Sequence, residues 1–283
     1  MKPRNSSKPE SDDEQRRLAV LIDADNAQAS MIEGLLSEVA KYGVASAKRI
    51  YGDFTSTRLT QWKSALLKHS IGPVQQFAYT SGKNATDSSL IIDAMDLMYT
   101  GRFDGMCLVS SDSDFTRLAQ RLREGGLIVY GFGERKTPDA FVQACDKFIY
   151  TEVLRAEVTP GAPAKTLPRK SAKTPRKTAS NAVKEASPPT IAPAAAAVVA
   201  KAPVLPLPLD LLRRAIEEAS DEQGWAHLGV VGSYLTKIRP DFDPRLYGHR
   251  KLSDLFKSHA RYFAIDERGG VGGGKSLYVR ALE

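Results

Sequence analysis

Carboxylates stand at three points where predicted strands end or a predicted helix begins. Asp23 ends an apolar run, Asp112 follows a second apolar run, and Asp87 lies in the first turn of a predicted helix. Asp25 and Asp114 lie two positions further along the first and second of these segments. The carboxyl ends of parallel strands and the helix N-termini that follow them converge at one edge of a sheet. We therefore expect these carboxylates to meet at one rim.

Carboxylates that crowd together repel one another, and the repulsion pushes a pKa upward. A divalent cation removes this cost. An oxygen-only ligand set without His or Cys suits Mg²⁺ or Mn²⁺, which bind through a few carboxylates and a substrate phosphate. Such an ion polarises a phosphoryl oxygen and lowers the pKa of its bound water. The pattern is typical of phosphodiester hydrolysis.

Some of these carboxylates also have a structural alternative. Asp25 and Asp114 can each cap the helix that follows them. Asp23 and Asp112 directly end apolar strands, where we expect no local structural use for a carboxylate. Asp93, six positions after Asp87, rotates away from its face of the predicted helix, which leaves Asp93 as a supporting residue at most.

Several other polar residues near the predicted rim are candidates for contact with substrate. Lys83, Asn84 and Arg117 can bind phosphate, although an ordinary solvated surface position is the alternative for each. Arg49 and Tyr51, at the end of the second predicted strand, can face substrate in the same way.

Apolar runs alternate with amphipathic stretches before residue 155, as expected for a parallel sheet flanked by helices. The predicted strands are Leu18 to Asp23, Ala45 to Gly52, Val74 to Tyr79, Gly105 to Ser111 and Leu127 to Gly133. The predicted helices are Ala27 to Tyr42, Thr57 to His69, Thr86 to Tyr99, Asp114 to Glu124 and Pro138 to Asp146.

The C-terminal part predicts a small winged-helix-like α+β domain. Its predicted helices are Leu209 to Ala219, Leu228 to Ile238 and Leu252 to His259, and its predicted strands are Tyr262 to Asp266 and Ser276 to Arg280. Three helices followed by a glycine-rich hairpin are typical of this class.

The net charge of +7 comes from one segment. Residues 15–154 hold sixteen basic and sixteen acidic groups, whereas residues 155–201 hold nine basic and two acidic groups. This segment is rich in Ala, Pro and Lys and has too few large apolar residues to form a core. We predict a disordered tail at 1–15, a catalytic domain at 16–154, a disordered basic linker at 155–203 and the second domain at 204–283. The linker is either a solubilising spacer or a salt-sensitive phosphate contact.

Several protein classes are disfavoured. The sequence has no apolar run of about 18 residues that would span a bilayer and no signal-peptide pattern, so we expect a cytoplasmic protein without a membrane partner. Cys107 and Cys145 are expected to be buried, reduced thiols. The chain lacks the glycine-rich phosphate-binding fingerprints GxxxxGK[ST] and GxGxxG after a strand, which disfavours Rossmann nucleotide-binding enzymes.

An ordered set of motifs resembles the NYN domain, a PIN-like nuclease family, over about residues 16 to 154. The runs that carry the resemblance are LIDADN at 21–26, KNATD at 83–87, SSDSDF at 110–115 and CDKFI at 145–149. The resemblance implies metal ligation by Asp23, Asp87, Asp112 and Asp114, with Asn26 orienting a water or phosphate. Cys145 and Asp146 are assigned to the last helix of the domain.

The C-terminal segment is similar to the LOTUS domain, also called OST-HTH. The runs are WAHL at 225–228, PDFDPR at 240–245 and KLSDL at 251–255. The resemblance implies binding of RNA or of a protein partner. Arg245, Arg250 and Lys251 are the candidate phosphate contacts, although the near-neutral charge of this domain differs from that of a strongly basic RNA binder.

Three functions remain open at this point. The favoured one is a Mg²⁺- or Mn²⁺-dependent endoribonuclease with Asp23, Asn26, Asp87, Asp112 and Asp114 at its site. The second is a non-catalytic RNA-binding adaptor. The third is a phosphatase of the haloacid-dehalogenase kind with Asp23 as nucleophile, which the residue order disfavours because Lys83 precedes Ser110. The oligomeric state is not indicated.

Overall fold

The computed structural model describes residues 15–55, 57–77, 85–156, 205–269 and 275–282. The N-terminal domain (described residues 15–156) contains a six-stranded sheet of order β3-β2-β1-β4-β5-β6 in which all neighbouring strands are parallel. The expected parallel α/β fold is thereby confirmed. The predicted disorder of the tail and linker concerns residues that lie almost wholly outside the described ranges.

The strands of this sheet are β1 Arg17–Asp23, β2 Val44–Gly52, β3 Gly72–Gln75, β4 Gly105–Val109, β5 Ile128–Gly133 and β6 Lys147–Tyr150. The α-helices are α1 Ile32–Val39, α2 Trp62–His69, α3 Ala85–Tyr99, α4 Thr116–Glu124, α5 Asp139–Ala144 and α6 Thr151–Ala156. Short 3-10 turns are η1 Ala29–Met31, η2 Thr57–Leu59 and η3 Ser113–Phe115.

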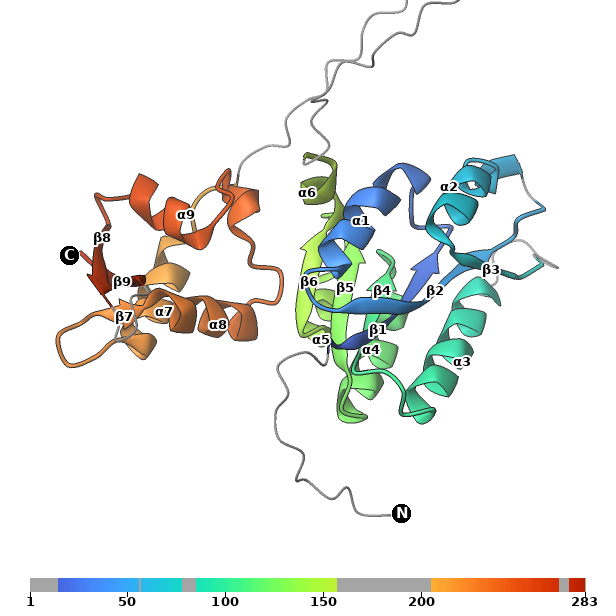
Figure 1. Ribbon diagram of the computed structural model, residues 1–283, viewed down its shortest axis with the longest axis horizontal. Helices are drawn as coiled ribbons and strands as arrows, with labels where there is room; N and C mark the ends of the chain where they lie inside the picture. The colour runs from blue at the N-terminus through green and yellow to red at the C-terminus, as the bar shows by residue number, and fades with distance from the viewer. Residues whose placement is uncertain (1–14, 56, 78–84, 157–204, 270–274, 283) are drawn as a thin grey trace, which may run out of the picture. The chain divides into compact units, whose positions relative to one another are not determined.

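Strand β1 is buried on both faces, which explains its continuous apolar sequence. Leu18, Val20 and Ile22 pack into a core with α1, α2 and α6. Ala19 and Leu21 point to the opposite face and pack into a second core with α3, α4 and α5. The sheet is therefore the middle layer between two helical layers (Figure 1).

The predicted last helix and the predicted third strand were wrong in their extent. The helix ends at Ala144 and Cys145 is extended, so residues 147–150 form the unpredicted edge strand β6. Asp146 begins this pairing because its backbone N–H donates to the Val129 carbonyl and its carboxylate accepts from the Val129 N–H. At the other edge, β3 includes Pro73, which an edge strand tolerates because one side of it needs no N–H donor.

The C-terminal domain (described residues 205–282) is a small α+β unit, as expected. Its helices are α7 Leu209–Ala219, α8 Leu228–Ile238 and α9 Leu252–Ser258, with the turn η4 Pro244–Tyr247. Its antiparallel sheet has the order β7-β9-β8, with β7 Ala226–His227, β8 Phe263–Gly269 and β9 Lys275–Ala281. The short strand β7 and the turn η4 were not predicted.

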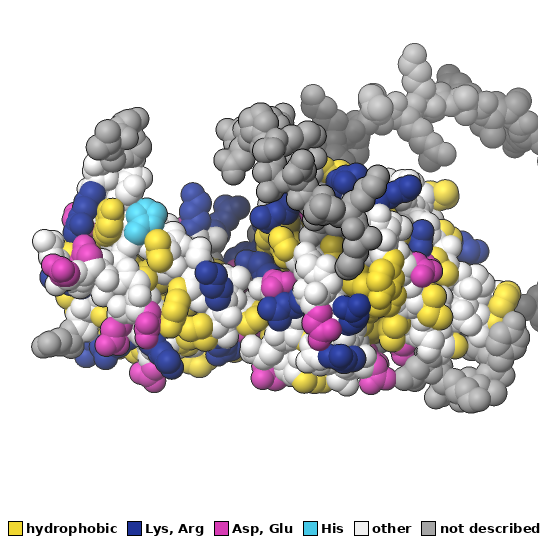
Figure 2. All heavy atoms as spheres, turned by 90° about the horizontal axis from the view of Figure 1, so that it is seen from below, with side chains coloured by type: hydrophobic (Ala, Val, Ile, Leu, Met, Phe, Trp, Pro, Cys, Tyr) yellow, Lys and Arg dark blue, Asp and Glu magenta, His cyan; other side chains and the backbone are white. Residues whose placement is uncertain are grey.

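Acidic and basic side chains are mixed on the face of the N-terminal domain drawn in Figure 2, in agreement with the equal numbers of both in this part of the sequence. Cys107 and Cys145 are buried and unpaired, as expected. Among the described residues, no helix is long and apolar enough to cross a membrane.

Candidate metal centre

The carboxyl ends of β1 and β4 lie side by side because these two strands are neighbours in the centre of the sheet. From β1 the chain proceeds outward to β2 and β3, and from β4 it proceeds the opposite way to β5 and β6. Helices that leave a parallel sheet in opposite directions open a crevice at this point. Asp23 ends β1, and Ser110 follows β4 directly, so both stand at this crevice.

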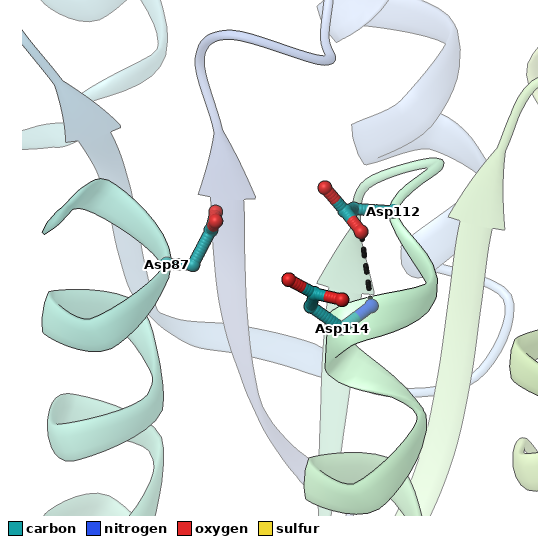
Figure 3. Close-up of side chains that lie close together, drawn as sticks. All are labelled: Asp87, Asp112 and Asp114. Carbon is teal, nitrogen blue, oxygen red and sulfur yellow. Dashed lines mark hydrogen bonds between the residues drawn. The ribbon is translucent and has the colours of Figure 1, made fainter. Parts of the chain in front are cut away.

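Three carboxylates converge at this crevice. One ligand oxygen from each of Asp87, Asp112 and Asp114 lies within 4.8 Å of those of the other two. Asp87 comes from the first turn of α3, whereas Asp112 and Asp114 come from the turn after β4 (Figure 3). The sequence-predicted meeting of distant acidic segments therefore takes place for these three residues.

The expectation that Asp112 has no local structural use was wrong. Asp112 is the N-cap of η3, and its carboxylate accepts a hydrogen bond of 2.9 Å from the Asp114 N–H. Asp114, for which capping was the alternative, is exposed in the first turn of η3. The capping bond fixes the Asp112 carboxylate beside Asp114, so a local role and a ligand role are compatible in one side chain.

Asp23 is fully buried at 0% exposure and lies at the centre of a hydrogen-bond network. Its Oδ1 accepts from the Asp25 N–H at 3.0 Å, and its Oδ2 accepts from the Asn26 amide at 2.7 Å and from the Ser110 hydroxyl at 2.8 Å. The Ser110 oxygen in turn accepts the Asp112 N–H at 3.1 Å. One hydroxyl thus joins Asp23 to the turn that carries the three-carboxylate cluster. Asp23 therefore also has a structural use that the sequence did not indicate.

The electrostatic state of Asp87 reflects this crowding. Partial burial, followed by the neighbouring negative charges of Asp23, Asp112 and Asp114, raises the pKa of Asp87 to about 6. Burial also raises the pKa of Asp23, although hydrogen bonds from Asn26 and Ser110 oppose the shift. A bound cation would offset the repulsion between these carboxylates and would favour their ionised form.

The donor set fits a hard divalent cation. Asp87, Asp112 and Asp114 offer only carboxylate oxygens, and neither His nor Cys belongs to this cluster. Oxygen donors of this kind suit Mg²⁺ or Mn²⁺, and the partial exposure of the cluster leaves room for the waters that Mg²⁺ retains.

Asp93 supports α3 from within the domain and does not join the cluster. Its carboxylate accepts from Arg49 at 2.7 Å and from the Tyr51 hydroxyl at 2.8 Å, which ties α3 to β2. Tyr51 is fully buried, so the prediction that it faces substrate was wrong. Because Asp87 lies on the same helix, this tie also holds Asp87 at the rim.

The predicted phosphate contacts occupy different environments. Lys83 lies outside the described residues. Arg117 points along α4 to Gln120 and Glu124, at 3.2 and 3.3 Å. Arg245 is engaged by Asp243, at 2.7 Å from its Nη2, whereas Arg250 and Lys251 are exposed.

Two residues at the rim, Ser110 and Gly133, were not predicted from the sequence to belong to the site. Ser110 bridges Asp23 and Asp112, and the only signal for it was its place in the SSDSD run. Gly133 ends β5, where a Cβ would stand 2.6 Å from the Ser110 carbonyl oxygen. Its signal was a glycine at the end of an apolar strand, which often marks a close backbone approach.

Sheet order and site geometry together define the N-terminal domain as a parallel α/β domain with a carboxylate cluster that could hold a metal ion. Residues 17–154 match the NYN domain, and residues 204–273 match the OST-HTH/LOTUS domain. The chain therefore carries an NYN domain followed by an OST-HTH/LOTUS domain, which confirms both resemblances. NYN domains are PIN-like and usually ribonucleases, and the two domains imply nucleic-acid binding.

Similar solved structures come from three bacteria. An uncharacterized protein from Nitrosomonas europaea is 45% identical, with 30% of this chain and 84% of that chain covered and a TM-score of 0.27. A protein of unknown function from Vibrio parahaemolyticus is 18% identical, with 50% and 95% covered and a TM-score of 0.42. A protein fragment from Chromobacterium violaceum is 37% identical, with 26% and 77% covered and a TM-score of 0.23. No curated protein matches the chain.

Proposed function

We propose that the NYN domain is an endoribonuclease that hydrolyses RNA phosphodiester bonds with Mg²⁺ or Mn²⁺. The observation that carries the proposal is the convergence of Asp87, Asp112 and Asp114 within 4.8 Å at the crevice beside β1. Bound there, the ion supplies a polarised phosphoryl oxygen and a water of lowered pKa.

The chain's own residues hold and orient this site. Asp87, Asp112 and Asp114 bind the ion. We propose Asp23 as the fourth acid, because its buried negative charge adds to the electrostatic attraction of the site for a cation. Asn26 and Ser110 hold the Asp23 carboxylate in one orientation, and Ser110 also fixes the Asp112 N–H. Such pre-set hydrogen bonds keep the ligands in place when substrate binds.

The test uses the full chain and a circular single-stranded RNA, which has no ends and is linearised only by an endonuclease. Mg²⁺ or Mn²⁺ should linearise the circle and EDTA should prevent it. Asp112→Asn should abolish cleavage, because asparagine keeps the capping oxygen for the Asp114 N–H but loses the ligand charge.

The matched control is Asp96→Asn, which removes an exposed charge from α3 away from the cluster and should cut like the parent chain. Equal cleavage by Asp112→Asn and the parent chain would sink the assignment of this site.

A second candidate is a non-catalytic RNA-binding adaptor. Both oxygens of Asp23 already accept hydrogen bonds, from Asp25, Asn26 and Ser110, and this favours the adaptor because a ligand role requires Asp23 to share an oxygen that is already bonded. RNA binding without metal-dependent cleavage would identify the adaptor. The haloacid-dehalogenase alternative loses support, because its nucleophile Asp23 is fully buried.

A further inference from the structure

The antiparallel sheet of the C-terminal domain has one face turned away from the core. Ala226, Val279 and Phe263 are buried in the core of this domain. Neighbouring residues along a strand point to opposite faces. The cross-strand row His227, Tyr278 and Asp266 therefore lies on the outward face.

Aromatic rings gather on this outward face. Trp225 precedes β7 and is held by Asp221, whose carboxylate accepts the Trp225 N–H at 2.9 Å. Gly224 supplies the positive φ of 75° that this turn requires. His227 and Tyr278 meet edge to face, with ring centroids 5.4 Å apart. Trp225 and Tyr278 are partly exposed and His227 is exposed, although polar side chains are the ordinary choice on the solvent side of a sheet.

Two guanidinium groups lie over these rings. Arg268 stands 4.4 Å from the Tyr278 centroid and 5.3 Å from that of Trp225, and Arg280 stands 4.9 Å from that of Trp225. Arg268 also pairs with Asp266 at 2.9 Å. Among the described residues, Arg280 is exposed and forms no ion pair with a carboxylate. The face therefore carries an excess of positive charge beside flat rings.

We propose that this face, formed by Trp225, His227, Tyr278, Arg268 and Arg280, binds single-stranded RNA. Unpaired bases stack on aromatic rings and on guanidinium planes, and the same guanidinium groups attract the phosphates. In a base-paired duplex the faces of the bases are stacked on one another, so a duplex can offer its phosphates to the arginines but no free base to the aromatic rings. The proposal rests on RNA being the ligand of this chain, but it does not require that the NYN domain cuts RNA.

The two tryptophans of the chain give a direct readout. Trp62 is fully buried in the N-terminal core, whereas Trp225 is partly exposed. Stacking of a base on Trp225 should therefore quench the contribution of Trp225 to the tryptophan fluorescence of the full chain and leave that of Trp62 unchanged. The titration uses a mixed-sequence RNA of about 12 nucleotides, single-stranded or paired with its complement, in EDTA so that no metal-dependent cleavage takes place.

We expect the single strand to quench the emission and to bind about tenfold more tightly than the duplex. Trp225→Leu should remove the quenching and weaken binding about tenfold, as loss of one stacked base does. Arg280→Gln changes an exposed side chain and is the safer variant for folding. It should weaken binding about threefold to tenfold and lower the salt slope of the affinity by about one.

The matched control is Arg214→Gln, which removes the same charge from the exposed face of α7 and should bind like the parent chain. Thermal melting of each variant shows whether it folds. Absence of quenching, or equal weakening by Arg280→Gln and Arg214→Gln, would overturn the proposal. Quenching by RNA in a chain that never linearises the circular RNA would leave this site standing and reject the nuclease, and cleavage without quenching would do the reverse.

Discussion

Asp87→Asn should stabilise the metal-free protein although it removes a candidate ligand. The pKa of Asp87 in the folded state is about 6, against an ordinary value of 3.8. The folded protein therefore binds more protons than the unfolded chain between these pH values. The stability contribution of Asp87 is fully present below about pH 4 and is lost as the pH rises through about 6. At pH 8 the ionised carboxylate is a cost that asparagine removes.

The magnitude follows from the size of the pKa shift. A shift of about two units corresponds to about 3 kcal/mol, and partial exposure of Asp87 reduces this to about 1–2 kcal/mol because solvent screens the charges. Asp87 also lies in the first turn of α3, where a negative charge is favoured by about 0.5 kcal/mol. The crowding outweighs the helix dipole, and the net gain of about 1 kcal/mol should raise Tm by about 2–4 °C.

The assay is thermal unfolding in EDTA at pH 8 and at pH 4, for the parent chain, Asp87→Asn and the control Asp96→Asn. Asp87→Asn should melt higher than the parent chain at pH 8 and close to it at pH 4. Addition of Mg²⁺ at 100 times its Kd should stabilise the parent chain by about 2.7 kcal/mol and reverse the order, because the variant lacks a ligand.

Two results would refute this reasoning. A variant that melts lower than the parent chain at pH 8 in EDTA would show that Asp87 is not under charge repulsion. An advantage of equal size at pH 4 and pH 8 would show that its origin is not the ionisation of Asp87.

Two further substitutions test how the rim is held. Asp93→Ala should destabilise the domain by about 1–3 kcal/mol, because the buried Tyr51 hydroxyl and Arg49 lose their acceptor. Denaturant unfolding measures the loss of stability. A loss as small as that caused by Asp96→Ala would contradict the role of Asp93 in joining α3 to β2. Gly133→Ala should lower the free energy of unfolding by about 1–3 kcal/mol and slow RNA cleavage, because the new methyl group displaces the Ser110 carbonyl. Unchanged melting temperature and cleavage rate would show that the backbone accommodates the methyl group without cost.

Sequence patterns predicted the parts of the fold that depend on local periodicity. The amphipathic helices α7 and α8 have the predicted bounds, and the buried strand β1 differs by one residue, because hydrophobic spacing alone defines them. Strand β6 was missed because it has only four residues, begins shortly after α5 ends at Ala144, and pairs with β5 through long-range contacts. Short edge elements such as β7 carry no periodicity of their own.

The location of the candidate site was predictable from the sequence, but the roles of its individual carboxylates were not. Strand ends indicated that Asp87 and Asp112 would meet, since parallel strands deliver their carboxyl ends to one edge. The capping bond of Asp112 and the burial of Asp23 depend on the turn geometry after β4, which no spacing rule encodes. The tie from Asp93 to Tyr51 joins residues 42 positions apart and was likewise invisible.

The bond between Asp23 and Ser110 joins residues 87 positions apart in the chain. A ribosome therefore releases β1 long before it has made the strand that completes the rim beside it. Until β4 and the turn after it emerge, the nascent protein has Asp23 but neither Asp112 nor Asp114. Under the proposed function, the growing chain therefore cannot cut RNA, including the messenger that encodes it, until the centre of its sheet has closed.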